Sequence, residues 1–150
     1  MATALIMVAT AWIKMPVPGG AGYAHAGDAI LFACATALGP WGAWAAGLGS
    51  ALADVWAGYP VYVPLTFCVK AVMGYVAGRY AVGGVKRRVC VFIGAQVWMA
   101  AGYFAFDSVL YGLAPALAAL PFSLFVQGGV GVALGTLLSG WRVQQLRRQV

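Results

Sequence analysis

The amino-acid sequence predicts an all-α membrane protein: a compact bundle of six transmembrane helices that forms one domain over residues 1–150. Hydrophobic residues make up 63% of the chain and charged residues only 8%, whereas charged residues are about a quarter of a typical soluble domain. The mean hydropathy is +0.89. Because the apolar residues come in several blocks, no segment of soluble-domain size remains outside them.

Six apolar blocks are the expected helices. A helix rises 1.5 Å per residue, so a hydrocarbon core of about 30 Å needs about 20 residues. In chain order the blocks are residues 1–13, 28–38, 41–56, 65–82, 89–111 and 116–141. The first two are shorter than a full span requires.

Proline and glycine residues mark the ends of these blocks, because both interrupt helices. The breaks are Pro16, Pro18, Gly19 and Gly20; Gly39 and Pro40; Gly58, Pro60 and Pro64; and Gly112 and Pro115, with Pro121 near the start of the last block. A cleavable signal peptide ending near Ala9-Thr10-Ala11 is a weaker alternative for the first block, since it has no basic region at its start.

The basic residues predict the orientation in the membrane. Seven of the nine lie near the end of the fourth block, between it and the fifth, or after the sixth: Arg79, Lys86, Arg87, Arg88, Arg142, Arg147 and Arg148. Short cytoplasmic loops carry such an excess, so we expect both termini in the cytoplasm and the first, third and fifth loops outside. This topology, with attraction to anionic lipid, explains the net charge of +6 without a nucleic-acid partner.

Several chemistries lack the residues they need. The three cysteines form no CxxC pair and have no histidine at metal-ligand spacing, which argues against a metal site. The chain has no GxxxxGK[ST] loop, so ATP chemistry cannot be its own. No nucleophile with an acid/base pair can be named either. We therefore expect neither an enzyme nor a bound cofactor.

Polar residues inside the apolar blocks are the first candidates for function. Charges at membrane depth are costly and usually face a partner or an aqueous cavity. Lys70 and Asp54 lie near the outer ends of neighbouring helices, so they form either a structural ion pair or part of a ligand pocket. The stretch "GYAHAGDA", residues 22–29, places Tyr23, His25 and Asp28 in the first outer loop. Asp28 there would bind ligand, cap the following helix, or do both.

Aromatic residues gather at the same outer end. An interfacial aromatic belt is the ordinary explanation, but the rings lie beside the acidic residues and Lys70, and together they would fit a flat heterocycle with polar edges. The candidate stacking or lid residues are Tyr23, His25, Trp56, Tyr59, Tyr62 and Tyr103. The candidate polar contacts are Asp28, Asp54, Lys70, Asp107 and Ser123, and Gln127 is expected to form the floor of the pocket. With a pKa near 6.5, His25 in an exposed loop would make capture sensitive to pH.

Small residues recur at four-residue spacing on the helices, which lets membrane helices approach closely. Most such stripes are expected to pack inside the bundle. One of them could dock a second membrane protein, and its residues are Gly39, Ala43, Gly47 and Ala51.

Four motifs in order carry a family resemblance: "WIKMPVPGGAGYAHAGDAILFACATALGP", "GLGSALADVWAGYPVYVPLTFCVKAVMGYVAGR", "GYFAFDSVLYG" and "ALPFSLFVQGGVGVALG". Over residues 13–138 the chain resembles the S components of energy-coupling factor (ECF) vitamin transporters, closest to the riboflavin-type group. The resemblance implies a first loop that closes over an outward-facing vitamin site. It also implies a transmembrane T component and two cytoplasmic ATPases as partners.

The implied function is the substrate-binding subunit of an ECF-type importer in a prokaryotic cell membrane. Its cargo would be a water-soluble B-type vitamin or precursor, with pyridoxine, hydroxymethylpyrimidine and riboflavin all open because Ser123 stands where related sequences tend to have Asn. Ala4 and Ala9 are the docking candidates of the first block, although its alanines miss the small-xxx-small spacing of the family. An autonomous small-solute carrier or channel is the alternative.

Overall fold

The computed structural model describes residues 1–12, 14–16 and 23–147, and side chains outside 13–24 and 141–150. The elements are α1 (Ala2–Trp12), β1 (Lys14–Pro16), β2 (Tyr23–His25), α2 (Gly27–Leu38), η1 (Gly39–Trp41), α3 (Gly42–Ala57), η2 (Pro60–Tyr62), α4 (Val63–Tyr80), α5 (Val85–Tyr111), α6 (Leu113–Pro121), η3 (Phe122–Gly128) and α7 (Gly129–Arg147). The short η1 and η2 are 3₁₀-helices, whereas η3 is a π-helix.

The helical class predicted from the sequence is confirmed, and the second, third and fourth predicted helices agree with α2, α3 and α4 to within two residues. Three features differ. The last predicted helix, residues 116–141, begins earlier and ends later, as the run α6–η3–α7 over Leu113–Arg147. The first loop contains an antiparallel pair of three-residue strands, β1 and β2, in which Lys14 is opposite His25. The fifth helix begins at Val85 rather than at residue 89, so Lys86 and its two basic neighbours lie on α5 instead of in a loop.

Among the described residues, four helical stretches are long and apolar enough to cross a membrane: Gly27–Ala57, Pro60–Tyr80, Val85–Tyr111 and Leu113–Gly140. The chain is therefore a multi-pass membrane protein. The helix α1 is also apolar but shorter, and Ile13 at its predicted end lies outside the described residues.

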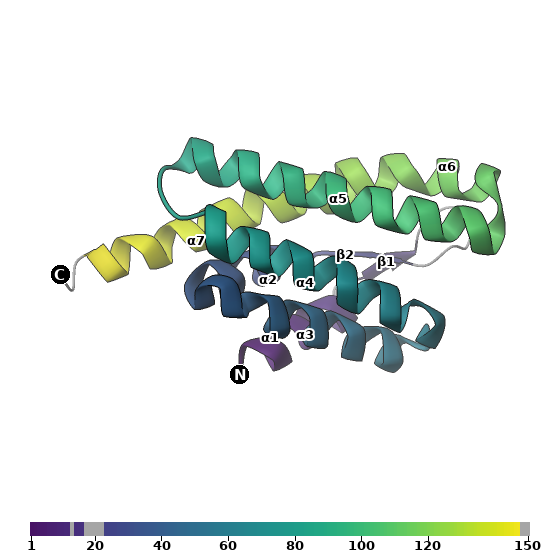
Figure 1. Ribbon diagram of the computed structural model, residues 1–150, viewed down its shortest axis with the longest axis horizontal. Helices are drawn as coiled ribbons and strands as arrows, with labels where there is room; N and C mark the ends of the chain where they lie inside the picture. Colours follow the sequence, from purple (N-terminus) through teal and green to yellow (C-terminus); the bar gives the residue numbers. More distant parts are fainter. Residues whose placement is uncertain (13, 17–22, 148–150) are drawn as a thin grey trace.

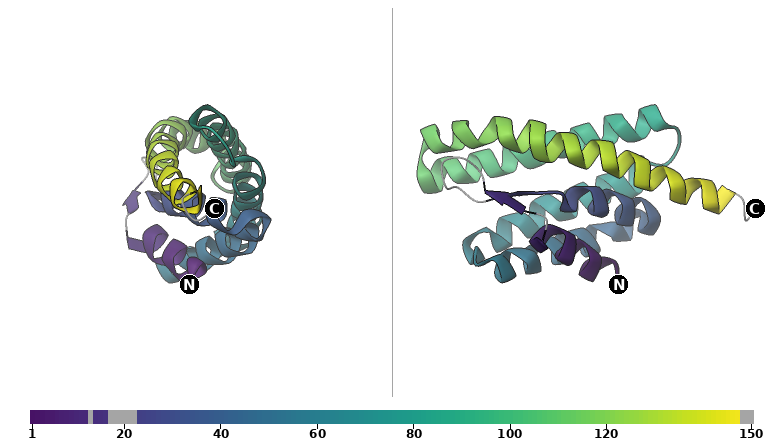
Figure 2. Two further views of the ribbon diagram at one scale, coloured as in Figure 1. Left: turned by 90° about the vertical axis from the view of Figure 1, so that its left-hand side faces the viewer. Right: turned by 180° about the vertical axis from the view of Figure 1, so that it is seen from behind.

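The chain reverses direction between α2 and α3 (Figures 1 and 2). The reversal occurs at Gly39, which has a φ of 64°, a conformation that glycine adopts without strain. In Figure 1 this turn, the α4–α5 turn and the end of α7 lie at the left end of the bundle, whereas the α3–α4 and α5–α6 connections lie at the right end. The end-on view in Figure 2 shows α4 between α3 and α5.

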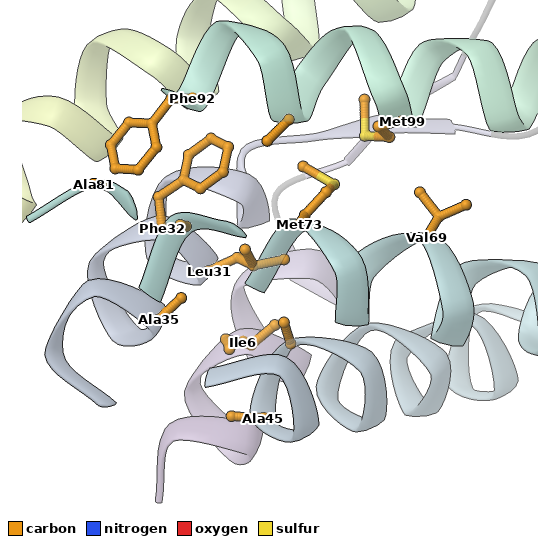
Figure 3. Packing of buried hydrophobic residues seen from close by; sticks show 13 residues of the cluster. Ile6, Leu31, Phe32, Ala35, Ala45, Val69, Met73, Ala81, Phe92 and Met99 are labelled. Atoms are coloured by element: carbon orange, nitrogen blue, oxygen red, sulfur yellow. The ribbon is translucent and has the colours of Figure 1, made fainter. Parts of the chain in front are cut away.

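Stacked aromatic rings and the close packing of small residues hold the bundle together. The rings of Phe32 and Phe92 stack at 4.1 Å with an interplanar angle of 7°, and Figure 3 shows them facing each other across the core. Gly78 lies so close to the backbone of Gly39 that a Cβ at position 78 would overlap it, and a Cβ at Gly74 would meet the Gly42 carbonyl at 2.6 Å. Small residues thus bring α4 against η1 and α3, as expected for membrane helices.

The expected docking stripe is only partly exposed. Gly47 and Ala51 are buried, and a Cβ at Gly47 would lie 3.0 Å from the Phe67 side chain on α4. These two residues therefore pack inside the chain, which corrects the expectation of an exposed stripe at this point. Gly39 and Ala43 are half-buried.

Candidate functional site

A buried ion pair lies at the centre of the site. Nζ of Lys70, on α4, donates a hydrogen bond to Oδ1 of Asp28, in the first turn of α2, at 2.5 Å. Both side chains are 0% exposed. Burial of this kind requires the remaining polar atoms of the pair to find partners as well.

Two glutamines provide those partners on the Asp28 side. Nε2 of Gln127 donates to Oδ2 of Asp28 at 2.9 Å, and Nε2 of Gln96 donates to the same oxygen at 3.2 Å. Sδ of Met99 accepts from Lys70 at 3.0 Å and from Gln127 at 3.3 Å. Side chains from α2, α4, α5 and η3 therefore meet at one carboxylate. We call Asp28, Lys70, Gln96, Met99 and Gln127 the polar cluster.

The segment that carries Gln127 has an unusual backbone. Pro121 has no N–H to donate, and the chain continues from it as the π-helix η3 before α7 begins. Single π-helical turns occur frequently at functional sites. A Cβ at Gly131, one turn beyond Gln127, would lie 2.5 Å from Nε2 of Gln96 and 3.1 Å from Cβ of Asp28. The absence of a side chain at Gly131 therefore gives the polar cluster its room.

His25 joins the first loop to the polar cluster. It lies at the end of β2 and is 9% exposed. Its Nδ1 accepts from the backbone N–H of Gly27 at 3.2 Å, and its Nε2 lies 3.5 Å from Nε2 of Gln127. Burial lowers the pKa of His25 from 6.5 to about 4, although Asp28 opposes this shift. The expected titration near pH 6.5 is therefore wrong, because the ring is buried rather than in an exposed loop.

A second group of side chains, the aromatic cluster, consists of Tyr62, Thr66, Tyr103, Phe106 and Asp107. The Tyr62 hydroxyl donates to Oδ1 of Asp107 at 2.6 Å. The Tyr62 ring lies 6.2 Å from that of Tyr103 and 5.5 Å from that of Phe106, measured between centroids. The Tyr103 hydroxyl shares a hydrogen bond of 2.8 Å with Thr66.

The two clusters are neighbours on the same helices. Thr66 precedes Lys70 by four residues on α4, and Met99 precedes Tyr103 by four residues on α5. Residues four apart on a helix lie one turn apart on the same face. Aromatic faces and polar groups therefore follow one another along the α4–α5 interface.

The remaining predicted residues are more scattered. Asp54 is buried near the end of α3, and Tyr59 is half-buried with its ring 6.3 Å from that of Tyr62. Trp56 is 72% exposed, as expected for an aromatic belt, and Ser123 is half-buried on η3. The backbone of Tyr23 lies on β2, but its side chain lies outside the described residues.

Two interpretations of single residues need correction. Lys70 pairs with Asp28 and not with Asp54. Gly47 of α3 packs on Phe67 and Ala71 of α4, so Lys70 lies beside the turn of α3 that contains Gly47. Asp54 is seven residues further along α3, which is about 10 Å along the helix axis. It is therefore too far from Lys70 to form the pair. Asp28 also does not cap α2, because it lies inside the helix, whose N-cap residue is Ala26.

Sequence reasoning missed Gln96, Met99 and Thr66 as members of the two clusters. Gln96 is not among the polar contacts predicted from the sequence. Its face on α5 also carries Met99 and Tyr103, at spacings of three and four, which is the signal that a helical projection would have shown. Within the described part of the chain, no group of three or more His, Cys, Asp or Glu residues could hold a metal ion.

The fold and the site together define a class: an integral membrane protein with a buried, polar and aromatic site between its helices. Comparison with known proteins is more specific. A family model described as "ECF-type riboflavin transporter, S component" matches residues 1–145. A protein from Pyrococcus woesei with the description "Uncharacterized protein in gap 3'region" is 32% identical over 133 residues, which cover 87% of this chain and 88% of that protein.

The chain belongs to the family of ECF-type riboflavin transporter S components. This is a family of transporter subunits and not of enzymes. Its members bind a vitamin substrate and work with the ECF T component and ATPase modules. The resemblance found in the sequence is thereby confirmed over nearly the whole chain.

Proposed function

We propose that this protein captures a water-soluble B-type vitamin or precursor from outside a prokaryotic cell. A transmembrane T component and two cytoplasmic ATPases would then drive its uptake. One observation carries the proposal: in a chain of this family, polar side chains from several separate segments converge on Asp28 inside an otherwise apolar bundle.

The proposed topology has six passes with both termini in the cytoplasm. The reversal at Gly39 supports it, because the stretch Gly27–Ala57 then crosses as two antiparallel segments, α2 and α3 (Figure 1). Counting α1, α4, α5 and the continuous α6–η3–α7 run gives the other four. The basic start of α5 and the end of α7 lie at one end of the bundle, which the positive-inside rule assigns to the cytoplasm.

Among the candidate cargoes we place riboflavin first, because the matching family model is named for it. The aromatic cluster offers faces on which a flat ring stacks, and the polar cluster offers donors and acceptors for its edge. Pyridoxine and hydroxymethylpyrimidine have the same combination of flat ring and polar edge, so they are the other compounds to test.

We assign the first loop to closure over the bound ring. His25 supports this role because it connects the β1–β2 strand pair to Gln127 of the polar cluster. Tyr23 is the expected second lid residue. Alanine variants at positions 23 and 25 that bind vitamin as tightly as the parent protein would rule out the lid.

The T component is expected to dock on the surface that includes α1. Ala4 is exposed there and Ala9 is half-buried. Gly39 and Ala43 are the parts of the second stripe that remain accessible. An Ala4→Leu variant should weaken assembly with the T component, measured by co-purification, while leaving vitamin binding unchanged.

The first experiment is native mass spectrometry of the detergent-purified protein after expression in rich medium, with denaturation to identify any bound compound. A stoichiometric vitamin supports the proposal and names the cargo. An empty protein whose melting temperature shifts with none of the three candidate vitamins contradicts it. Vitamin flux into liposomes that contain this chain alone would instead support an autonomous carrier.

Binding constants of variants test the site itself. Tyr103→Ala and Gln127→Ala should each weaken vitamin binding by about tenfold or more, since each removes a ring face or a hydrogen-bonding group. Tyr75→Ala is the matched control, because Tyr75 is an exposed tyrosine of α4 that belongs to neither cluster. Equal losses in all three variants would argue against the proposed site.

A further inference from the structure

Arg88 is a buried cation that the vitamin site does not use. It is the fourth residue of α5 and is only 5% exposed. Its Nε and Nη1 atoms are buried and have no hydrogen-bond partner among the described residues. A guanidinium in this position is expected to have a counter-ion, because an unpaired charge is costly to bury.

The protein does not provide that counter-ion within its described part. The sequence contains three acidic residues: Asp28 pairs with Lys70, Asp107 accepts from Tyr62, and no salt bridge joins Arg88 to any of them. Asp54 lies near the end of α3 that leads to α4, whereas Arg88 lies at the opposite end of the bundle, next to the α4–α5 turn (Figure 1). Within the described residues Arg88 therefore has no carboxylate partner, and an anionic ligand from outside the chain can fill that role.

The guanidinium lies between α5 and α7. A Cβ at Gly140 would be 3.6 Å from both Nη1 and Nη2 of Arg88 and 3.8 Å from its Cζ. Because Gly140 has no side chain, the N–H donors of the Arg88 guanidinium face bare backbone on this side of α7. Thr136, one turn earlier on α7, has a buried hydroxyl that also lacks a partner among the described residues. Hydroxyl and guanidinium groups both donate to phosphate oxygens.

The start of α5 adds further positive charge around Arg88. The first turn contains Lys86 and Arg87 and no acidic residue, and no side chain caps the helix. Both basic side chains are exposed, and Nε of Arg87 donates to the Tyr80 carbonyl at 2.8 Å. Unsatisfied N–H groups and the helix dipole make such an N-terminus favourable for anions.

Exposed apolar side chains next to these cations suggest what carries the anion. Val82 is 55% exposed and Val85 is 58% exposed, and they lie on either side of the α4–α5 turn. A phospholipid provides a partner for both kinds of residue on this surface. Its phosphate can bind the basic side chains, and its acyl chains can cover the exposed valines. Basic pockets between transmembrane helices are known to bind anionic head groups.

We propose that Arg88, with the N-terminus of α5, binds the phosphate of an anionic phospholipid at the end of the bundle where α5 and α7 meet. The site is separate from the polar and aromatic clusters. It does not depend on which vitamin the protein carries.

The test uses the full chain purified in a zwitterionic detergent. Phosphatidylglycerol, phosphatidylcholine or inorganic phosphate is added, and both the bound lipid, by native mass spectrometry, and the melting temperature are measured. Arg88→Met removes the charge and keeps much of the bulk, whereas Arg88→Lys keeps the charge but loses the fork. Arg79→Gln is the control, because Arg79 is an exposed cation at the end of α4 and its loss changes the net charge equally.

We expect the parent protein and Arg79→Gln to retain phosphatidylglycerol about tenfold better than Arg88→Met, with Arg88→Lys between them. Phosphatidylglycerol should raise the melting temperature of the parent protein but not that of Arg88→Met. A comparable rise with inorganic phosphate alone would support the site with free phosphate as its ligand. Equal retention by all variants, or equal retention of phosphatidylcholine, would overturn the proposal and leave a carboxylate of a partner protein as the counter-ion.

Discussion

Lys70 and Asp28 form an ion pair between α4 and α2, 42 residues apart in the chain and fully buried. Such a pair is a weak source of net stability, because the cost of removing two charges from water offsets their attraction. Its effect on specificity is larger. Each charge requires the other, so α2 and α4 have one favourable register in which Gln96 and Gln127 also reach the carboxylate.

Breaking this pair from one side should be strongly destabilising. Asp28→Asn or Lys70→Met leaves one buried charge without its partner, which we expect to cost about 3–5 kcal/mol in the free energy of unfolding. The double variant should lose less than the sum of the two single losses. Unfolding in detergent micelles measures all three, and Arg79→Gln is the exposed control. Strictly additive losses would show that the two side chains do not interact.

The hydroxyl of Tyr62 offers a smaller change. Tyr62→Phe keeps the ring and its contacts but leaves Oδ1 of Asp107 without its 2.6 Å donor, so the free energy of unfolding should fall by about 1–3 kcal/mol. Tyr75→Phe, at an exposed tyrosine of α4, should change it by less than about 0.5 kcal/mol. If the two variants are equally stable, the Tyr62–Asp107 hydrogen bond contributes nothing measurable.

The helices could be predicted from sequence because the signals are local. Blocks of apolar residues and the prolines and glycines between them set the ends of α2, α3 and α4 to within two residues. The start of the apolar block is a poorer guide on α5, because the helix already begins before it and includes Lys86 and Arg87. Charged residues are compatible with a helix, and only Gly83 and Gly84 interrupt the chain there.

The partners of the site residues could not be predicted in the same way, because they depend on helix register. Because Asp54 and Lys70 lie near the outer ends of neighbouring helices, the sequence suggests that they form an ion pair. The close contact of Gly47 with α4 instead fixes a register of α3 and α4 in which the two side chains are apart. The role of Gln127 depends on the π-helix after Pro121, which a count of 3.6 residues per turn does not give. The β1–β2 pair, which carries His25 into the site, has three residues per strand and leaves almost no pattern.

Acid should destabilise the protein through His25. The folded chain holds this ring neutral with a pKa of about 4, whereas in the unfolded chain the value is 6.5. Between these values the unfolded state binds a proton that the folded state does not, so stability falls as the pH drops through this window and levels off below it. The loss should reach about 3 kcal/mol.

The matched variant for this measurement is His25→Gln, which cannot titrate. Asp28 and Lys70 face the ring, and their contribution to the pH dependence is present in both proteins, so the difference between the two curves isolates the histidine. Unfolding free energies from pH 7.5 to 4 provide the comparison. Parallel curves for parent and variant would mean that the pKa of the ring is the same in the folded and unfolded chains.

Two glycines within membrane helices, Gly78 and Gly94, should respond in opposite directions to the same substitution. At Gly78 an alanine Cβ would overlap the backbone of Gly39, so α4 and η1 must separate, and we expect a loss of about 1–3 kcal/mol. At Gly94, on α5, no atom lies within 4 Å of the added Cβ. Gly94→Ala should therefore stabilise the helix by up to about 1 kcal/mol, because alanine has the higher helix propensity. Melting temperatures of the two variants in the same detergent measure both effects, and a stable Gly78→Ala protein would show that this close approach of α4 and η1 is not needed for the fold.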